Sequence, residues 1–218
     1  MSQQSTFQFG FIEENSDDFI TSESNRIAYE MIKSWPKWSS NIVLIYGDKS
    51  CGKTHLAKIW QKASNAKFLN ALDVYTNRYD VSNNYIIDGI EKISDEAAFF
   101  HFFNRFKENG NGSLLLTSSK HPAQGGIRLA DLRSRLSALP SAGISRPDDE
   151  MLRTIFVKKF AERQLKVDID VINYLITRVE RSFTFAEELV VLLDKQALRE
   201  KKNITIPFVR VVLGDKDC

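Results

Sequence analysis

Residues 41–54 read NIVLIYGDKSCGKT, an apolar run followed by a loop that contains two glycines and two lysines. The loop, residues 47–54, satisfies the pattern G-x-x-x-x-G-K-[ST], and the stretch that follows, THLAKIWQKA, has a helical pattern. A buried strand before this pattern and a helix after it are typical of a loop that binds phosphate. We therefore predict a phosphate-binding loop, called the phosphate loop below. The alternative is a glycine turn with a chance lysine.

Each residue type in the phosphate loop suits a nucleoside diphosphate or triphosphate. Gly47 and Gly52 let the backbone curl so that N–H groups point at phosphate oxygens, and the following helix adds its positive end. Lys53 is expected to neutralise the β- and γ-phosphates, and the Thr54 hydroxyl to ligate Mg²⁺. The predicted binding residues are Gly47, Asp48, Lys49, Ser50, Cys51, Gly52, Lys53, Thr54 and His55.

Short apolar runs alternate with helical stretches on both sides of the phosphate loop. Runs at 41–46, 84–88 and 113–118 read as buried strands, and 53–64 and 94–108 read as helices. Uninterrupted apolar strands that alternate with helices predict a parallel sheet covered on both faces, an α/β fold. Past Pro147 the apolar positions recur at helical spacing only. We predict an extended, partly mobile arm at 1–19, an α/β domain at 20–146 and a small all-helical domain at 147–218.

Two predicted strand ends carry further candidate residues. Asp88 ends the strand YIID and is expected to hold Mg²⁺ through water, although a carboxylate at a strand end is also a common cap. The next residue is Gly89, where many such ATPases carry a carboxylate that orients water, so hydrolysis within this chain is in doubt. Glu91 is the substitute, but one turn further on it is expected to face solvent. Ser118 and Ser119 end another strand, either as γ-phosphate sensors or as turn formers.

These residues resemble the AAA+ ATPases, and within them the branch of the bacterial replication initiator DnaA. The likeness covers almost the whole chain after residue 19 and rests on FITSESNRIAYEMI, VLIYGDKSCGKTHLAKI, YIIDGIE, LLLTSSKHP and LRSRL. It implies an AAA+ domain with a helical lid and a bound ADP or ATP with Mg²⁺. It also implies that Asp88 is the magnesium aspartate, Ser119 the first sensor and Arg135 an arginine finger, with Arg133 the weaker candidate.

The chain ends at Cys218, so we expect neither the helix-turn-helix DNA-binding domain of the initiator nor its long N-terminal domain. These expected absences make the chain similar to the Hda family, short DnaA homologues that provoke hydrolysis of DnaA-bound ATP and so prevent re-initiation. The resemblance implies DnaA as a partner and Arg135 acting on the partner's nucleotide. It leaves open a homodimer, weak or indirect DNA contact, a self-contained ATPase related to DnaA or helicase loaders, and a regulator that binds origin DNA.

The lid departs from the family pattern at its second sensor, where an arginine is usual and Glu187 stands here. A physical alternative explains the glutamate, because Thr184 and Glu187 have the spacing of a capping box at a helix start. An acid at this place favours ADP as the resident nucleotide, or a weak ATPase.

The N-terminal segment QSTFQF matches the peptide with which Hda proteins dock on the DNA polymerase sliding clamp. Gln4, Phe7 and Phe9 fit its pattern, since an extended segment can place two rings in an apolar pocket while the amide fixes orientation. The alternative is that the phenylalanines fold back on the core.

Composition argues against several other classes of protein. The formal net charge of +2 gives no dominant basic field for nonspecific nucleic-acid binding. The two cysteines, Cys51 and Cys218, offer no disulfide framework. Since no apolar run approaches the roughly 18 residues of a membrane span and no signal peptide is evident, a cytoplasmic protein without membrane contact is expected.

Overall fold

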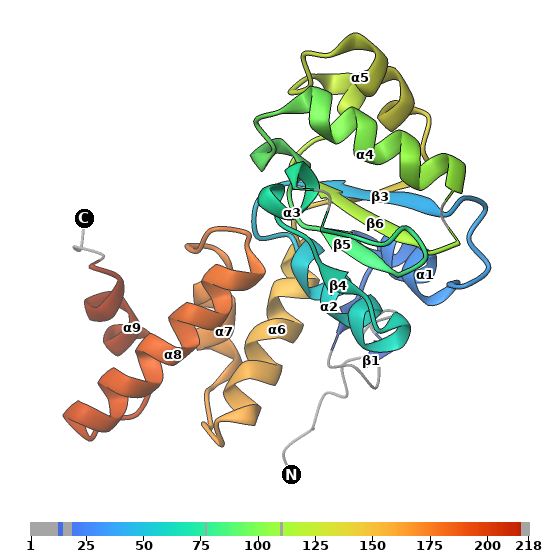
Figure 1. The fold of residues 1–218 in the computed structure, drawn as a ribbon. Helices are drawn as coiled ribbons and strands as arrows, with labels where there is room; N and C mark the ends of the chain where they lie inside the picture. Colours follow the sequence, from blue (N-terminus) through green and yellow to red (C-terminus); the bar gives the residue numbers. More distant parts are fainter. Residues whose placement is uncertain (1–12, 15–18, 77, 110, 215–218) are drawn as a thin grey trace. The chain divides into compact units, whose positions relative to one another are not determined.

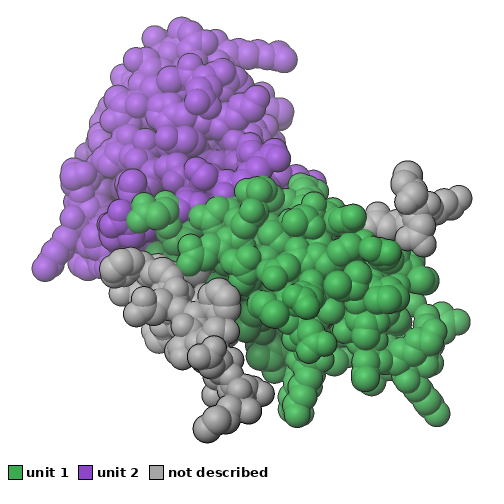
Figure 2. Space-filling model, turned by 180° about the vertical axis from the view of Figure 1, so that it is seen from behind, with its two compact units in different colours: residues 1–23, 147–218 green, residues 24–146 purple. Residues whose placement is uncertain are grey.

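A computed structural model describes residues 13–14, 19–76, 78–109 and 111–214 (Figure 1). The chain divides into two compact units, which Figure 2 shows in different colours. Residues 24–146 form the α/β unit, and residues 147–218 together with 1–23 form the helical unit. The segment 20–23, which the sequence analysis assigned to the α/β domain, thus lies in the helical unit. The expected α/β class is confirmed.

The α/β unit is built on a five-stranded parallel sheet with the order β4-β5-β6-β3-β7. Its strands are β3 (Ile42–Gly47), β4 (Lys67–Phe68), β5 (Tyr85–Ile87), β6 (Leu114–Ser118) and β7 (Ser141–Ile144). Its helices are α1 (Arg26–Lys33), α2 (Lys53–Ser64), α3 (Ala71–Tyr75), α4 (Glu96–Asn109) and α5 (Ala130–Ser137), with short 3₁₀ turns η1 (Ile90–Lys92) and η2 (Pro122–Gln124). Leu116 of β6 pairs with Leu44 of β3 and with Ile87 of β5, which brings three strand ends to one edge.

Both faces of this sheet are covered, which explains the uninterrupted apolar runs. Helices α4 and α5 lie on one side of the sheet, and α1 and α2 lie on the other (Figure 1). Alternate strand residues such as Ile42 and Leu44 pack with the α4 phenylalanines, because successive side chains of a strand point to opposite faces. The buried α4 stripe is Phe99, Phe102, Phe103 and Phe106.

Strand β7 was not predicted from the sequence. Its residues, SAGI, form no apolar run, yet they pair in parallel with β3 and complete the sheet. A glycine suits position 143 because a Cβ there would lie 3.0 Å from the Tyr46 ring, closer than ordinary van der Waals contact.

The helical unit contains four helices among its described residues: α6 (Asp149–Glu162), α7 (Ile169–Ile176), α8 (Phe183–Glu200) and α9 (Ile206–Leu213). Their apolar faces share one core, which includes Leu152, Phe156, Leu175 and Leu193. Asp148 caps α6 as expected for an aspartate before a helical run, because its carboxylate accepts from Met151 N.

Two short strands, β1 (Glu13–Glu14) and β2 (Ile20–Thr21), pair antiparallel in the helical unit. Ile20 joins the helical core, and the Ser22 hydroxyl lies 2.9 Å from Met151 Sδ on α6. Phe19 is also buried. Of the arm predicted at 1–19, only residues 13–14 and 19 are described, and these are paired or buried, so the predicted mobility of the arm stays a prediction.

The capping box predicted from Thr184 and Glu187 is wrong. The N-cap of helix α8 is Ser182, two residues before Thr184, and its hydroxyl accepts from Phe185 N. The helix therefore begins at Phe183. Phe183 and Phe185 pack against the helical core, which favours the earlier start. Glu187 instead forms an ion pair with Lys159 of α6 at 3.2 Å.

Candidate nucleotide-binding site

The candidate site lies at the carboxyl edge of the parallel sheet, where ligands bind in open α/β folds. The phosphate loop follows β3, Asp88 follows β5, Ser119 follows β6 and Arg146 comes two residues after the end of β7. Strand β3 lies between β6 and β7. The register therefore brings together residues that are about 100 positions apart in the sequence, such as Gly47 and Ile144.

The backbone of the phosphate loop is curled by residues with left-handed conformations. Ser50 has φ 61° and Gly52 has φ 104°, and Gly52 is the N-cap of α2. Gly47 is required by close packing, because a Cβ there would lie 2.3 Å from the carbonyl oxygen of Ile144. The start of the 12-residue helix α2 adds unsatisfied N–H groups and a positive dipole end to the loop.

Lys53 lies over the loop that precedes it. Its ammonium donates to the carbonyl oxygens of Gly47 at 2.8 Å and of Asp48 at 2.7 Å. The ammonium is therefore held inside the curl of the loop, and the charge there has the sign that a phosphate requires. The phosphate loop thus combines curled backbone, a helix start and a lysine, as its sequence predicts.

Two hydroxyl groups donate to the Asp88 carboxylate, and one of them, that of Thr54, belongs to the phosphate loop. Thr54 Oγ1 donates to Asp88 Oδ2 at 2.8 Å, and Thr117 Oγ1 donates to Asp88 Oδ1 at 2.6 Å. A hydroxyl beside a carboxylate supplies the oxygen ligands that Mg²⁺ prefers, so Thr54 and Asp88 fit the predicted metal role. Among the described residues no group of three or more His, Cys, Asp or Glu side chains lies together as a ready-made metal cage.

Thr117 belongs to the site, although the sequence analysis did not single it out. It is fully buried in β6, and its oxygen also accepts from Gly89 N at 2.8 Å. A threonine before the last residue of an otherwise aliphatic strand, LLLTS, is the signal in the sequence that marks it.

Position 89, directly after Asp88, is a glycine and carries no carboxylate that could orient a water molecule. Gly89 has φ 89°, a conformation that side chains with a Cβ rarely adopt. Lys92 Nζ donates to Asp88 O at 3.1 Å and covers this turn, and Glu91 is exposed, as expected.

The two candidate sensor serines differ in their surroundings. Ser118 is buried, and its hydroxyl accepts from Lys120 N at 3.4 Å, the role of a turn former. Ser119 is half-buried, and both serines line a hollow together with Glu91, Gln124 and Gly126. Its role as first sensor stays a prediction.

Arg135 and Arg133 are both exposed on α5, on the side of the sheet that α4 covers. The Arg135 guanidinium lies 5.1 Å from the centre of the Phe100 ring, and its Nη1 donates to Asn104 Oδ1 at 2.7 Å. Arg133 Nη1 donates to Ile127 O at 3.3 Å. Both arginines thus contact the chain segment around α4 and residue 127 rather than the phosphate loop, and the finger role stays a prediction.

Cys51 is buried within the phosphate loop, at 2% exposure. Burial raises the pKa of its thiol above the ordinary value of 9.0, although the nearby Lys53 charge opposes that shift. A protonated, buried thiol is a poor nucleophile, which agrees with assigning Cys51 no chemical role.

The clamp-binding residues predicted from the sequence, Gln4, Phe7 and Phe9, lie outside the described residues. Within the described part of the chain, no helix is long and apolar enough to span a membrane.

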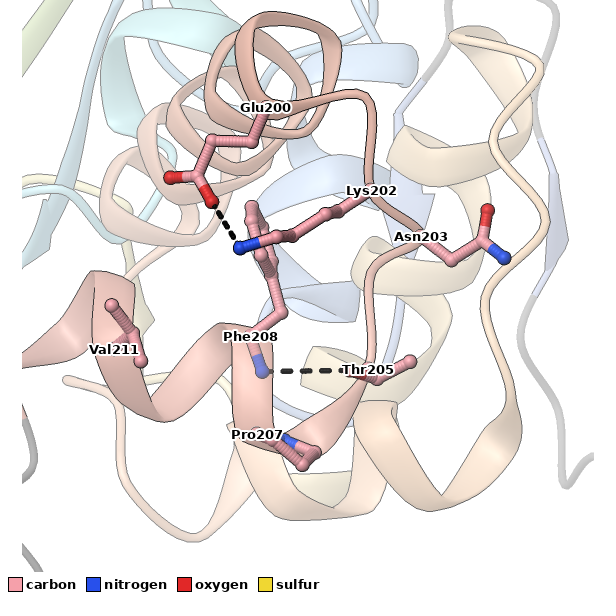
Figure 3. Close-up of a pocket in the computed structure, with 7 residues that line it drawn as sticks. All are labelled: Glu200, Lys202, Asn203, Thr205, Pro207, Phe208 and Val211. Carbon is pink, nitrogen blue, oxygen red and sulfur yellow. Dashed lines mark hydrogen bonds and ion pairs between the residues drawn. The ribbon is translucent and has the colours of Figure 1, made fainter.

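A separate hollow of about 390 Å³ lies in the helical unit, where α8 leads into α9 (Figure 3). Two of its polar groups have partners within the hollow: Lys202 pairs with Glu200 at 2.8 Å, and the Thr205 hydroxyl accepts from Phe208 N (Figure 3). Its side chains give no convergent set of catalytic or ligand-binding groups, unlike the carboxyl edge of the sheet.

Comparison with known proteins agrees with this geometry. The family model of the bacterial DnaA ATPase domain matches residues 11–96, and that of the Hda lid domain matches residues 148–213. An uncharacterized protein of Haemophilus influenzae is 29% identical over 185 residues, which cover 78% of this chain and 80% of that protein. The initiator DnaA of Wolinella succinogenes is 27% identical over 92% of this chain, but only 52% of DnaA is covered. The chain therefore spans about half the length of that initiator.

Solved structures share the fold. Domain III of the Thermotoga maritima replication initiation protein DnaA superposes with a TM-score of 0.75 at 18% identity, over 90% of this chain and 94% of that one. AMPPCP-bound DnaA from Aquifex aeolicus gives a TM-score of 0.68 at 23% identity, over 85% and 68%. The resemblance to the DnaA branch is thereby confirmed. The chain is related to DnaA, with a nucleotide-binding domain like that of DnaA and a lid domain of the Hda type.

Proposed function

We propose that this protein binds ADP or ATP with Mg²⁺ at the phosphate loop and acts as a negative regulator of DnaA. The observation that carries the proposal is the arrangement at the carboxyl edge of the sheet, where the phosphate loop holds the Lys53 ammonium and the next residue, Thr54, donates to Asp88. A DnaA relative of the same fold is solved with AMPPCP, an ATP analogue, which supports adenine as the base.

Each residue of the site has a separate task in this proposal. The loop N–H groups and the start of α2 bind phosphate oxygens, and Lys53 leaves its two carbonyl partners to neutralise the β- and γ-phosphates. Thr54 and Asp88 hold Mg²⁺, which when bound supplies positive charge to the phosphate oxygens. Thr117 fixes the orientation of the Asp88 carboxylate through its hydrogen bond. Ser119 senses the γ-phosphate from the end of β6.

Hydrolysis by this chain alone is expected to be slow. Gly89 stands where a carboxylate would orient water, and Glu187 of the lid is paired with Lys159 and carries the wrong sign for a γ-phosphate. The protein therefore serves as an activator of a partner's ATPase rather than as an independent motor.

The partner in this proposal is DnaA with bound ATP. Arg135 is exposed on α5, so its guanidinium is accessible to a second protein. An arginine supplied by one protein to another's nucleotide stabilises charge that develops during phosphoryl transfer, and contributes about 10³- to 10⁵-fold in rate. Gln4, Phe7 and Phe9 dock the protein on the sliding clamp, which concentrates it at newly replicated DNA.

The test measures hydrolysis of DnaA-bound ATP with and without this protein, in the presence of clamp loaded on DNA. Arg135→Ala is expected to abolish the stimulation while nucleotide affinity and melting temperature stay unchanged. Arg133→Ala tests the weaker candidate on the same helix, and it is expected to keep the stimulation; loss of stimulation only in Arg133→Ala would assign the finger role to Arg133. Unchanged stimulation by Arg135→Ala would disprove the finger role.

Clamp docking is tested separately by co-purification with the sliding clamp. Replacement of Gln4 and Phe7 by alanine is expected to remove clamp retention without changing nucleotide binding. If the natural protein and the variant are both retained by the clamp, the clamp contact lies elsewhere in the chain.

A further inference from the structure

An ion pair joins the phosphate loop to the end of β7. Arg146 Nε donates to Asp48 Oδ2 at 2.7 Å. Asp48 is the residue after Gly47, and Gly47 pairs with Ile144 across the β3–β7 ladder, so the two strand ends are held side by side. Both residues belong to the α/β unit, and Arg146 is its last residue before the helical unit begins at Pro147.

This ion pair adds little to the stability of the fold. Its side chains are 62% and 54% exposed, and exposed ion pairs contribute little because water and salt screen them. The pair matters because it lies next to the lysine of the phosphate loop: the Asp48 backbone carbonyl is one of the two oxygens that accept from the Lys53 ammonium. The Asp48 carboxylate is thus attached to the loop that should receive a phosphate.

A carboxylate in this position has the wrong charge for an anion site. The phosphate loop offers N–H groups, a helix start and Lys53, all of positive sign, and Asp48 opposes them. Two like charges about 8 Å apart near a protein surface repel by an amount that changes an affinity several-fold. A guanidinium hydrogen-bonded to the carboxylate cancels most of that repulsion.

We propose that Arg146 sets the nucleotide affinity of this protein by neutralising Asp48 at the entrance to the phosphate loop. Arg146 is a positioning residue in this role, since it acts on the nucleotide through Asp48 rather than by touching it. The proposal rests on the proposed nucleotide binding. Because ATP carries more negative charge than ADP, the loss of Arg146 weakens ATP binding more than ADP binding.

The experiment measures the dissociation constants of ADP and ATP by calorimetry at low and at moderate salt. Arg146→Ala is expected to weaken ADP binding about 3-fold and ATP binding about 10-fold at low salt, with smaller effects as salt rises. Asp48→Asn is expected to tighten the binding of both nucleotides at low salt, because it removes the opposing carboxylate and leaves the Arg146 charge beside the loop. The double variant Asp48→Asn with Arg146→Ala is expected to return to the affinity of the natural protein, and Arg146→Lys to keep most of it.

The matched control is Arg105→Ala. This variant also removes one arginine charge from the α/β unit. Arg105 lies in the second half of α4, which leads away from the carboxyl edge of the sheet, and its guanidinium is 5.3 Å from the centre of the Tyr79 ring. Its affinity for both nucleotides should equal that of the natural protein, and thermal melts of all variants show whether each is folded.

The outcomes separate this inference from the proposed function. If the natural protein binds neither ADP nor ATP, the proposed function fails. If it binds both and Arg146→Ala binds them equally well, only the role of Arg146 is overturned. If the double variant stays as weak as Arg146→Ala, Arg146 acts without Asp48 and the inference is also overturned.

Discussion

Thr54 Oγ1 lies 2.8 Å from Asp88 Oδ2, which joins the first turn of α2 to the end of β5. The two residues are 34 positions apart in the sequence. They meet because β3 and β5 both pair with β6 in parallel, so their carboxyl ends lie at one edge of the sheet. This contact places a hydroxyl and a carboxylate together beside the phosphate loop.

The first prediction concerns Mg²⁺. Asp88→Asn removes the charge that holds the metal. Its amide oxygen can still accept from one of the two hydroxyls, and its amide N–H can donate to the other, so the fold should persist. We expect nucleotide affinity to lose its dependence on Mg²⁺, with a fall of about 10-fold at saturating metal. Calorimetric titration with and without Mg²⁺ measures this. Glu108→Gln, at the far end of α4, removes a carboxylate elsewhere and should keep full Mg²⁺ dependence.

The second prediction concerns Thr117, whose oxygen serves Asp88 and Gly89 N at once. Thr117→Val keeps the shape but leaves the buried Gly89 N–H without its acceptor, at a cost of about 1–3 kcal/mol in the free energy of unfolding. Chemical denaturation measures the change. The same replacement at Thr54, which is exposed, should change stability by less than about 0.5 kcal/mol. Equal effects at both positions would contradict the assignment.

The third prediction concerns the turn after Asp88. Gly89→Glu restores a carboxylate at the position usual in active ATPases, but it also forces a side chain into φ 89° and against Lys92. We expect a loss of about 1–3 kcal/mol in stability and no gain in steady-state ATP hydrolysis. A variant that is both stable and active as an ATPase would show that Gly89 alone prevents catalysis.

The sequence predicted the parts of the site that depend on local pattern and strand order. Lys53, Thr54 and Asp88 follow apolar runs, and parallel strands must bring such ends together. Thr117 and β7 were missed for a physical reason: one is a single polar residue inside an apolar strand, and the other is held by its pairing with β3 rather than by its own hydrophobicity. Ser182 was missed as a cap because Phe183 and Phe185 pack on the core, which local capping rules do not include.

The fourth prediction concerns Cys51. Since burial raises the pKa of its thiol, the folded protein should react slowly with iodoacetamide at pH 8, and unfolding should restore ordinary reactivity. A raised thiol pKa also makes the folded state bind its proton more tightly. The associated stability is therefore complete below the ordinary pKa of 9.0 and is lost as pH rises through the folded value. Peptide mass spectrometry after timed alkylation measures the rate, and rapid labelling of Cys51 in the folded protein would contradict its burial.

The fifth prediction concerns the pair of Lys159 and Glu187 in the helical unit. Burial lowers the pKa of Lys159, but hydrogen bonds to Glu162 and Glu187 and the charges of both raise it, and the net shift is above the ordinary 10.5. Glu187→Gln should therefore lower the Lys159 pKa, which NMR titration of its side chain measures.

The sign of the accompanying stability change follows from the same shift. A lysine whose pKa is raised on folding contributes stability below its unfolded pKa, and that contribution disappears as pH rises through the folded value. The loss in Glu187→Gln at neutral pH should be at most about 0.5 kcal/mol, because the Glu187 side chain is 58% exposed and Glu162 remains 3.1 Å from the ammonium. A Lys159 pKa that does not move would show that Glu187 is not its partner in solution.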